Sequence, residues 1–131
     1  MKFDLVDQIL EQSETRIVTV TQVSPTEEYL EDHFPTFPIM PGVLMLEAMV
    51  QAASHLCSED GVHLVLGEVK AFKYGAMVQP GNRLHIEVTI VHSNGDGSFS
   101  CKGNGIVHRN DTTETATAVA GRFTIRPVHL S

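Results

Sequence analysis

The hydrophobic positions along the chain predict one long helix. Residues 43–56 are apolar at almost every position, and Pro41 precedes them where the first turn of a helix tolerates proline. A helix with hardly any polar face must be surrounded by protein, and this one is too short to span a membrane. We therefore expect a buried central helix that ends near Gly61.

The rest of the pattern predicts strands. TRIVTVTQV is rich in β-branched residues and precedes an irregular, proline-rich loop, EDHFPTFPIMPG. Phe3, Val6, Ile9 and Leu10 recur at helical spacing, which predicts a short N-terminal helix. The predicted fold class is α+β, one domain over residues 1–131 in which a curved antiparallel sheet wraps the central helix. After the helix the predicted strands are HLVLGEV, FKYGAMV, RLHIEVTIVH, SFSCKGNGIVHR and ETATAVAGRFTIR, separated by the turns QPGN, SNGDG and RNDTT.

Composition narrows the classes of protein. The 131 residues suit one domain, and 9 Lys and Arg against 16 Asp and Glu give a net charge of −7, which argues against a nucleic-acid partner. The amino terminus is acidic, unlike a secretory signal, and no membrane span is evident, so we expect a cytoplasmic protein. Cys57 and Cys101 lack metal-like spacing and are interpreted as buried thiols in a reducing compartment.

One carboxylate stands out in the apolar helix. Glu47, Gln51 and His55 are spaced four residues apart and form a single polar line along it. An unpaired buried charge costs several kcal/mol, so we expect Glu47 to be paired or partly neutral. It is either a structural glutamate bonded to the backbone or facing solvent at a poorly covered helix edge, or a general acid, which must be protonated near neutral pH.

Two further positions could complete a site beside Glu47. His33, in the loop before the helix, is either a surface or packing histidine or a candidate base. Gly42, at the helix start, offers a backbone N–H where the helix dipole favours a polarised carbonyl oxygen. No metal, triad-hydrolase or nucleotide-binding motif is present, and we expect no cofactor. The basic residues form either a scattered solvated set or a cluster at a tunnel mouth: Lys70, Lys73, Arg83, Arg109, Arg122 and Arg126.

Residues 33–51, HFPTFPIMPGVLMLEAMVQ, closely resemble a family pattern. The pattern H-F-P-G-x-P-I-x-P-G-V-L-x-x-E-A-M-A-Q is that of the FabZ-type 3-hydroxyacyl-[acyl-carrier-protein] dehydratases of bacterial fatty acid synthesis. Residues 78–84, VQPGNRL, are similar to the family's V-V-P-G-D-x-L, so the resemblance covers nearly the whole chain. It implies a hotdog fold and an obligate homodimer, with dimers commonly assembled into a trimer of dimers.

The resemblance also implies a reaction. His33 would abstract a proton from C2 of the 3-hydroxyacyl group, and Glu47 of the other protomer would expel the 3-hydroxyl as water. The Gly42 N–H would polarise the thioester carbonyl, giving a trans-2-enoyl product. The substrate would arrive on acyl carrier protein. The A-type dehydratase-isomerases have aspartate in place of Glu47, so the glutamate favours dehydration without isomerisation. The expected substrate-binding residues are Gly42, Thr36, Phe37, Val43 and Tyr74.

Two departures from the family pattern suggest a specialised member. Thr36 and Phe37 replace a glycine and a usually polar residue, and this bulk would narrow the acyl tunnel toward short or medium chains. Gly75 and Ala76 replace two basic residues near the tunnel mouth, which would weaken steering of a standard carrier and favour a dedicated one. The alternatives are an acyl thioesterase, an enoyl-CoA hydratase and a non-catalytic carrier-binding subunit.

Overall fold

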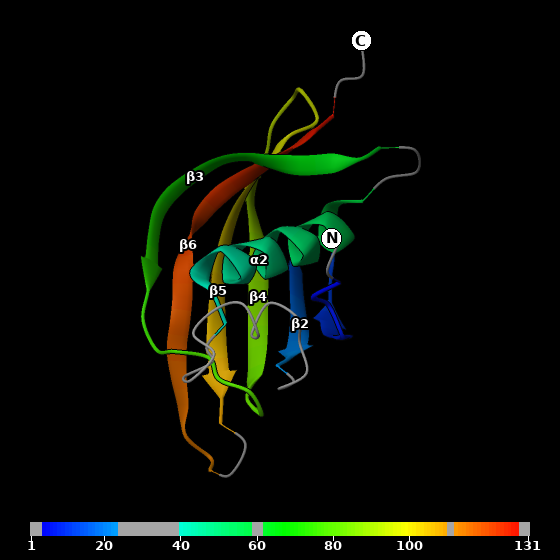
Figure 1. Cartoon of the computed structure of the whole chain (residues 1–131). Coiled ribbons are helices and arrows are strands. Elements are labelled where there is room, and N and C mark those ends of the chain that lie inside the picture. The colour runs from blue at the N-terminus through cyan, green and yellow to red at the C-terminus, as the bar shows by residue number, and fades with distance from the viewer. Residues whose placement is uncertain (1–3, 24–39, 59–61, 110–111, 129–131) are drawn as a thin grey trace.

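The chain folds as a curved antiparallel sheet with a long helix lying across it (Figure 1). The computed structural model describes residues 4–23, 40–58, 62–109 and 112–128. Six strands form one sheet in the order β1-β2-β4-β5-β6-β3. The elements are β1 (Gln8–Gln12), β2 (Arg16–Gln22), α2 (Gly42–Cys57), β3 (Leu64–Tyr74), β4 (Arg83–Ser93), β5 (Phe99–His108) and β6 (Thr115–Pro127).

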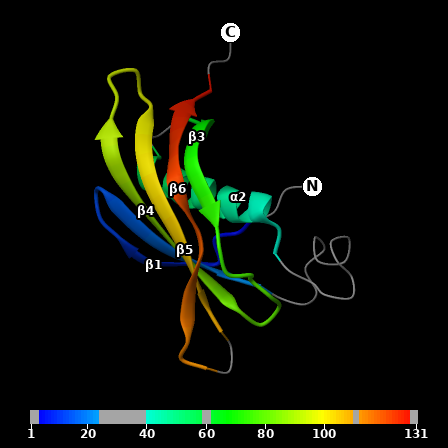
Figure 2. The same cartoon turned by 90° about the vertical axis from the view of Figure 1, so that its left-hand side faces the viewer.

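Helix α2 packs one side against the inner face of the sheet (Figure 2). Ala48, Ala52 and Ala53 are fully buried there, and these small side chains let the helix backbone approach the strands closely. Met49 is also fully buried and fills the remaining space beneath the helix. The predicted central helix is confirmed, although it ends at Cys57, before Gly61.

Strand β3 bends around the end of the helix and is one continuous strand, where the sequence predicted two (Figure 1). Its pairing with β6 shifts register twice, and Ala71 within the second shift has φ +54°, a conformation that a residue with a Cβ rarely adopts. The Phe72 ring then lies over Gly121, where a Cβ would be 2.2 Å from the ring. The bend therefore depends on a bulge in β3 and on a missing side chain in β6.

The predicted N-terminal helix is wrong for the part of that segment that the structure describes. Residues 4–7 are not helical, and Gln8–Gln12 form β1, which pairs with β2 through Gln8↔Val20 and Gln12↔Ile17. Helical spacing in such a short segment cannot exclude a strand, and pairing with β2 satisfies backbone groups that an isolated short helix would leave open. The predicted β2, β4, β5 and β6 are confirmed.

The outer face of the sheet carries polar side chains. Arg16 on β2 donates from Nε to Glu87 Oε2 on β4 at 2.7 Å and from Nη1 to Glu11 on β1 at 2.9 Å. The hydrogen bond from Arg16 lowers the pKa of Glu87. Nearby, the rings of His85 and His108 stack with centroids 3.7 Å apart. Burial lowers the pKa of His85, as do the charges of His108 and Arg83.

Candidate functional site

The structure describes four of the seven predicted site residues. Gly42, Val43 and Glu47 lie in the first half of α2, and Tyr74 is the last residue of β3. His33, Thr36 and Phe37 lie outside the described residues, so their roles remain predictions from the sequence.

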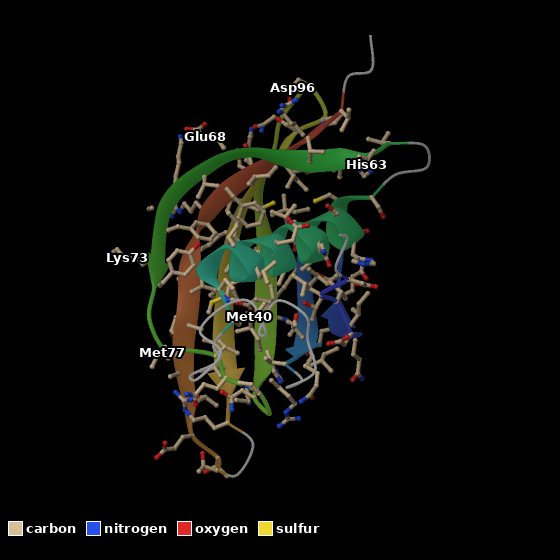
Figure 3. The ribbon with its side chains drawn as sticks, in the orientation of Figure 1. Met40, His63, Glu68, Lys73, Met77 and Asp96 are labelled. Carbon is tan, nitrogen blue, oxygen red and sulfur yellow. The ribbon has the colours of Figure 1, made fainter. Side chains whose placement is uncertain are left out.

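A groove of about 1090 Å³ lies between α2, the beginning of β3 and the segment before β1. Its apolar walls come from the helix and from the beginning of β3, where Leu64, Val65 and Leu66 lie. The polar line predicted from the sequence, Glu47, Gln51 and His55, lines this groove. His63 also lines it and lies near the C-terminal end of α2 (Figure 3). Its polar lining residues come from the segment before β1, from α2 and from the residue before β3. A concavity that combines apolar walls with polar groups able to orient a ligand is the usual form of a small-molecule site.

Glu47 is exposed in the single chain, which corrects the prediction that the helix is surrounded by protein on all sides. Val43, one turn earlier on the same side of α2, is 69% exposed. Gln51 Nε2 donates a hydrogen bond to Glu47 Oε1 at 3.3 Å, so the carboxyl group has a partner from its own helix. The hydrophobic pattern predicts only that this side of the helix is covered. It does not show whether the same chain or a second molecule covers it.

Gly42 is the first residue of α2 and lies beneath the ring of Tyr74. A Cβ at Gly42 would lie 2.9 Å from Tyr74 Cε1, so only glycine leaves the ring in this position without a shift. Pro41 precedes it in an extended conformation, and the Met40 N–H donates to the Val78 carbonyl at 2.8 Å, which fixes the entry to the helix. The first N–H groups of a helix have no acceptor within it, and no hydrogen bond among the described residues uses the Gly42 N–H, which lies beside Tyr74, a residue that is 52% exposed.

The second departure from the family pattern has a structural reason. Gly75 donates its N–H to the Ala118 carbonyl at 2.8 Å, and a Cβ at Gly75 would lie 2.6 Å from the Thr117 carbonyl oxygen. The backbone of β6 is too close for a larger residue. A basic side chain at this position would require β3 and β6 to separate.

The basic residues are partly clustered. In the cross-strand register, Lys102 on β5 is opposite Arg122 on β6, which is in turn opposite Lys70 on β3. All three side chains are exposed, and Glu68 lies 3.8 Å from Lys70 Nζ. Figure 3 shows Glu68 and Lys73 on the outer side of the bent β3 strand. Lys70, Arg122 and Lys102 therefore form a row across the sheet. Arg83 lies apart from this row, beside His85.

Cys57 and Cys101 lie close together, which their spacing in the sequence does not indicate. Cys57 ends α2 and Cys101 lies on β5, and both are buried with free thiols. The hydrogen bond to Cys57 and burial raise the pKa of Cys101, which makes Cys101 a poor nucleophile. The prediction of buried thiols is confirmed, and their contact follows from helix packing that sequence spacing does not reveal.

The described residues contain no candidate metal site and no candidate membrane span. No group of three or more His, Cys, Asp or Glu side chains lies together there as a metal site would require. Within those same ranges, no helix is both long enough and apolar enough to cross a membrane.

The fold is that of the hotdog proteins. The ApeI:P dehydratase heterocomplex of Xenorhabdus doucetiae superposes with a TM-score of 0.66 at 19% identity, covering 96% of this chain and 99% of that one. The smu.793 protein of Streptococcus mutans, solved bound to acetyl CoA, gives a TM-score of 0.71 at 15% identity, covering 98% of this chain and 92% of that chain. At these identities the similarity establishes the fold.

Sequence comparison identifies the family. A family model described as ApeI dehydratase, of the ApeI-like group, matches residues 9–114. The FabZ 3-hydroxyacyl-[acyl-carrier-protein] dehydratase of Geobacillus thermodenitrificans is 38% identical over 82% of this chain and 76% of its own length. That of Thermotoga petrophila is 42% identical over 66% of this chain, which spans 64% of that relative's length. The chain belongs to the ApeI-like dehydratase family, and the predicted relationship to the FabZ-type dehydratases is confirmed.

Proposed function

We propose that this protein dehydrates (3R)-3-hydroxyacyl groups carried on acyl carrier protein to trans-2-enoyl groups, in fatty acid synthesis or a specialised acyl pathway. Residues 1–131 would form a single hotdog domain that acts in the cytoplasm. Membership of a dehydratase family supports the reaction class. The observation that carries the proposal is the position of Glu47, a carboxyl group on the wall of a groove that is also lined by Val43, Leu44 and Leu66, in the first half of α2.

The reaction requires an acid, a base and a carbonyl-polarising group. His33 takes the proton from C2, and the electron pair of that C–H bond forms the C2–C3 double bond. The C3–O bond breaks as Glu47 donates a proton to the 3-hydroxyl, which leaves as water. The Gly42 N–H donates to the thioester carbonyl oxygen, which gains negative charge as the C2 proton leaves. Val43, which lines the groove with Glu47, and Tyr74, whose ring lies over Gly42, contact the acyl–pantetheine chain together with Thr36 and Phe37.

The active enzyme is proposed to be a homodimer, with each site formed by His33 of one protomer and Glu47 of the other. The exposure of Val43 and Glu47 supports this, because an apolar groove that is open in one chain is suited to closure by a second chain. Dimers would assemble further into a trimer of dimers. The ApeI:P protein of Xenorhabdus doucetiae is described as a heterocomplex, so the purified chain alone must be tested first.

The first experiment measures enoyl-thioester absorbance with 3-hydroxyacyl groups of graded length on acyl carrier protein and on coenzyme A. His33→Ala and Glu47→Gln should each lower kcat by about 10² to 10⁴-fold, the range for a lost general acid or base. Release of free thiol instead would indicate a thioesterase, and preference for coenzyme A an enoyl-CoA hydratase. No turnover on any carrier would refute the proposal and favour a non-catalytic carrier-binding subunit.

Mixing the two inactive variants tests the shared site. Unfolding and refolding His33→Ala and Glu47→Gln together gives mixed dimers in which one of the two sites has both intact residues, so about a quarter of wild-type activity should return. Refolding either variant alone is the control and should stay inactive. A mixture without recovered activity would place both residues of a site on one chain.

Two finer hypotheses concern specificity. Thr36 and Phe37 would narrow the tunnel and favour short or medium acyl chains, and equal turnover of C16 and C6 substrates would refute this. Loss of basic residues at Gly75 and Ala76 would favour a dedicated carrier. Efficient processing of substrate on the housekeeping carrier of the same organism would count against it.

A further inference from the structure

The segment before β1 lies between the sheet and helix α2. The Leu5 side chain is 4% exposed and belongs to the core. Its carbonyl accepts a hydrogen bond from the Thr21 hydroxyl on β2, and its backbone N–H donates to Gln51 Oε1 on α2 at 2.7 Å. The Asp7 N–H also donates to the Val20 carbonyl, so the segment is tied to β2 at two points. The two peptide groups of Leu5 therefore link the sheet to the groove side of the helix.

This link determines which way the Gln51 side chain faces. A backbone N–H can only donate, so the amide oxygen of Gln51 must point toward Leu5. The amide nitrogen is then on the opposite side, where it donates to Glu47 Oε1 at 3.3 Å. Reversing the amide would remove the acceptor for Leu5 and direct an oxygen at the Glu47 carboxylate.

Glu47 needs such a contact because packing within its own chain does not hold it. Its side chain is exposed on the groove, whereas Thr21 is 2% exposed and Leu5 is buried, so the fixed end of the chain of hydrogen bonds lies in the core. A reacting group that is misplaced by about 1 Å can lose 10²-fold in rate, so an exposed acid depends on the groups that orient it.

We propose that Thr21 and the Leu5 backbone act as positioning groups that orient Glu47 through Gln51. The inference rests on the proposed function of Glu47 as the acid. Neither Thr21 nor Leu5 contacts substrate in this proposal. The N-terminal segment would thus be part of the catalytic architecture, although the sequence pattern of residues 33–51 does not include it.

The main test replaces the Thr21 hydroxyl. Thr21→Val keeps the shape and burial of the side chain but removes the donor to the Leu5 carbonyl, so kcat should fall about tenfold with KM unchanged, within the range expected for small misplacement. Thr21→Ser retains the hydroxyl and should keep wild-type kcat. Thermal unfolding and circular dichroism confirm that both variants are folded at the assay temperature. A folded Thr21→Val protein with wild-type kcat would overturn the proposal.

A second variant gives a signature that a merely structural role would not. Gln51→Glu retains an acceptor for the Leu5 N–H but replaces the donor to Glu47 with a carboxylate oxygen. Its kcat should be strongly reduced near neutral pH and should recover relative to wild type as the pH falls, because a protonated carboxyl can donate again. Asp4, His55 and His63, the other titratable groups lining the groove among the described residues, are common to both proteins and cancel in the ratio. A constant ratio across the pH range would contradict the proposal.

Amide hydrogen exchange separates this inference from the proposed function. In Thr21→Val the Leu5 amide should exchange faster than in wild type, and this readout needs no substrate. A wild-type protein that is inactive on every substrate refutes the proposed function, and with it the catalytic meaning of the link. An active wild type with faster Leu5 exchange in Thr21→Val but unchanged kcat refutes only the positioning role.

Discussion

The two sides of helix α2 differ sharply: the side against the sheet is apolar, whereas the groove side also carries the polar line Glu47, Gln51 and His55. On the sheet side Ala48, Met49 and Ala52 are completely buried, and Gly103 on β5 approaches so closely that a Cβ there would lie 2.8 Å from Met49 Sδ. On the groove side Val43 is 69% exposed and Glu47 meets only the Gln51 amide among the hydrogen bonds of the described residues. One side is therefore closed by the chain itself, and the other is open.

This difference assigns different tasks to the two sides. Substitutions on the packed side should change the free energy of unfolding, since close packing leaves no room for adjustment. Those on the groove side should change activity and association with little effect on the stability of the single chain.

The largest effect is expected for Met49→Ala. Removing this fully buried side chain leaves a cavity against the sheet and should lower the free energy of unfolding by about 2–5 kcal/mol. Val43→Ala, on the open side, should change it by less than about 0.5 kcal/mol when urea unfolding is measured at protein concentrations low enough to give monomer. A comparable loss for Val43→Ala under those conditions would show that the groove side is covered within one chain.

Glycines offer a second test of the packed side. A Cβ at Gly105 on β5 would lie 2.8 Å from Val119 Cγ1 and 3.1 Å from Ile86 Cδ1, both in the core. Gly105→Ala should therefore destabilise the protein by about 1–3 kcal/mol through overpacking. Gly95, in the turn between β4 and β5, has no atom within 4 Å of the same position, so Gly95→Ala is the matched control and should be neutral or slightly stabilising. Equal denaturation midpoints for Gly105→Ala and Gly95→Ala would show that the core around Gly105 accommodates a methyl group without loss of stability.

The sequence predicted the packed side better than the open side. The buried alanines, the strands that pair in register and the turn at QPGN all follow from local patterns, because period and composition reflect burial within one chain. The N-terminal segment was the exception: spacing of Val6, Ile9 and Leu10 suits a helix, but pairing of Gln8–Gln12 with β2 prevails. Tertiary pairing overrides a weak local preference in so short a segment.

The candidate site was predicted by residue type but not by environment. Glu47 stands out in the sequence because a carboxylate interrupts an apolar helix, and the structure shows the solvent-facing environment that was one of the alternatives left open for it. The links from Gln51 to Leu5 and from Leu5 to Thr21 join residues far apart in sequence, and no local pattern signals them. The single bent strand β3 includes the positive φ of Ala71. An alanine in the sequence does not predict a positive φ, so the bend could not be predicted.

The bend of β3 provides a smaller test, because its first half forms the outer wall of the open groove. Ala71 has φ +54°, where a Cβ is unfavourable and glycine is not. Ala71→Gly should therefore raise the free energy of unfolding by up to about 1 kcal/mol, in contrast to the usual loss when alanine in a strand becomes glycine. Ala116→Gly, in β6 at a position without positive φ, is the control and should be destabilising. A loss of stability in Ala71→Gly would mean that the bend is imposed elsewhere.

The smallest effect concerns the outer face of the sheet, which neither side of α2 touches. Burial and the neighbouring His108 and Arg83 lower the pKa of His85, so the folded state holds the neutral imidazole while the unfolded chain binds a proton below about pH 6.5. The folded state then binds fewer protons, and the stabilising contribution present above pH 6.5 is lost as pH falls toward the lowered pKa.

His85→Gln should remove this part of the pH dependence of the free energy of unfolding between pH 8 and 5.5. His92→Gln, at an exposed position near the end of the same strand, should leave the slope unchanged. Urea unfolding at several pH values measures both slopes, and the sum of the carboxylate contributions is common to all three proteins. If the free energy of unfolding changes with pH equally in wild type and His85→Gln, protonation of the stacked His85–His108 pair does not destabilise the folded state.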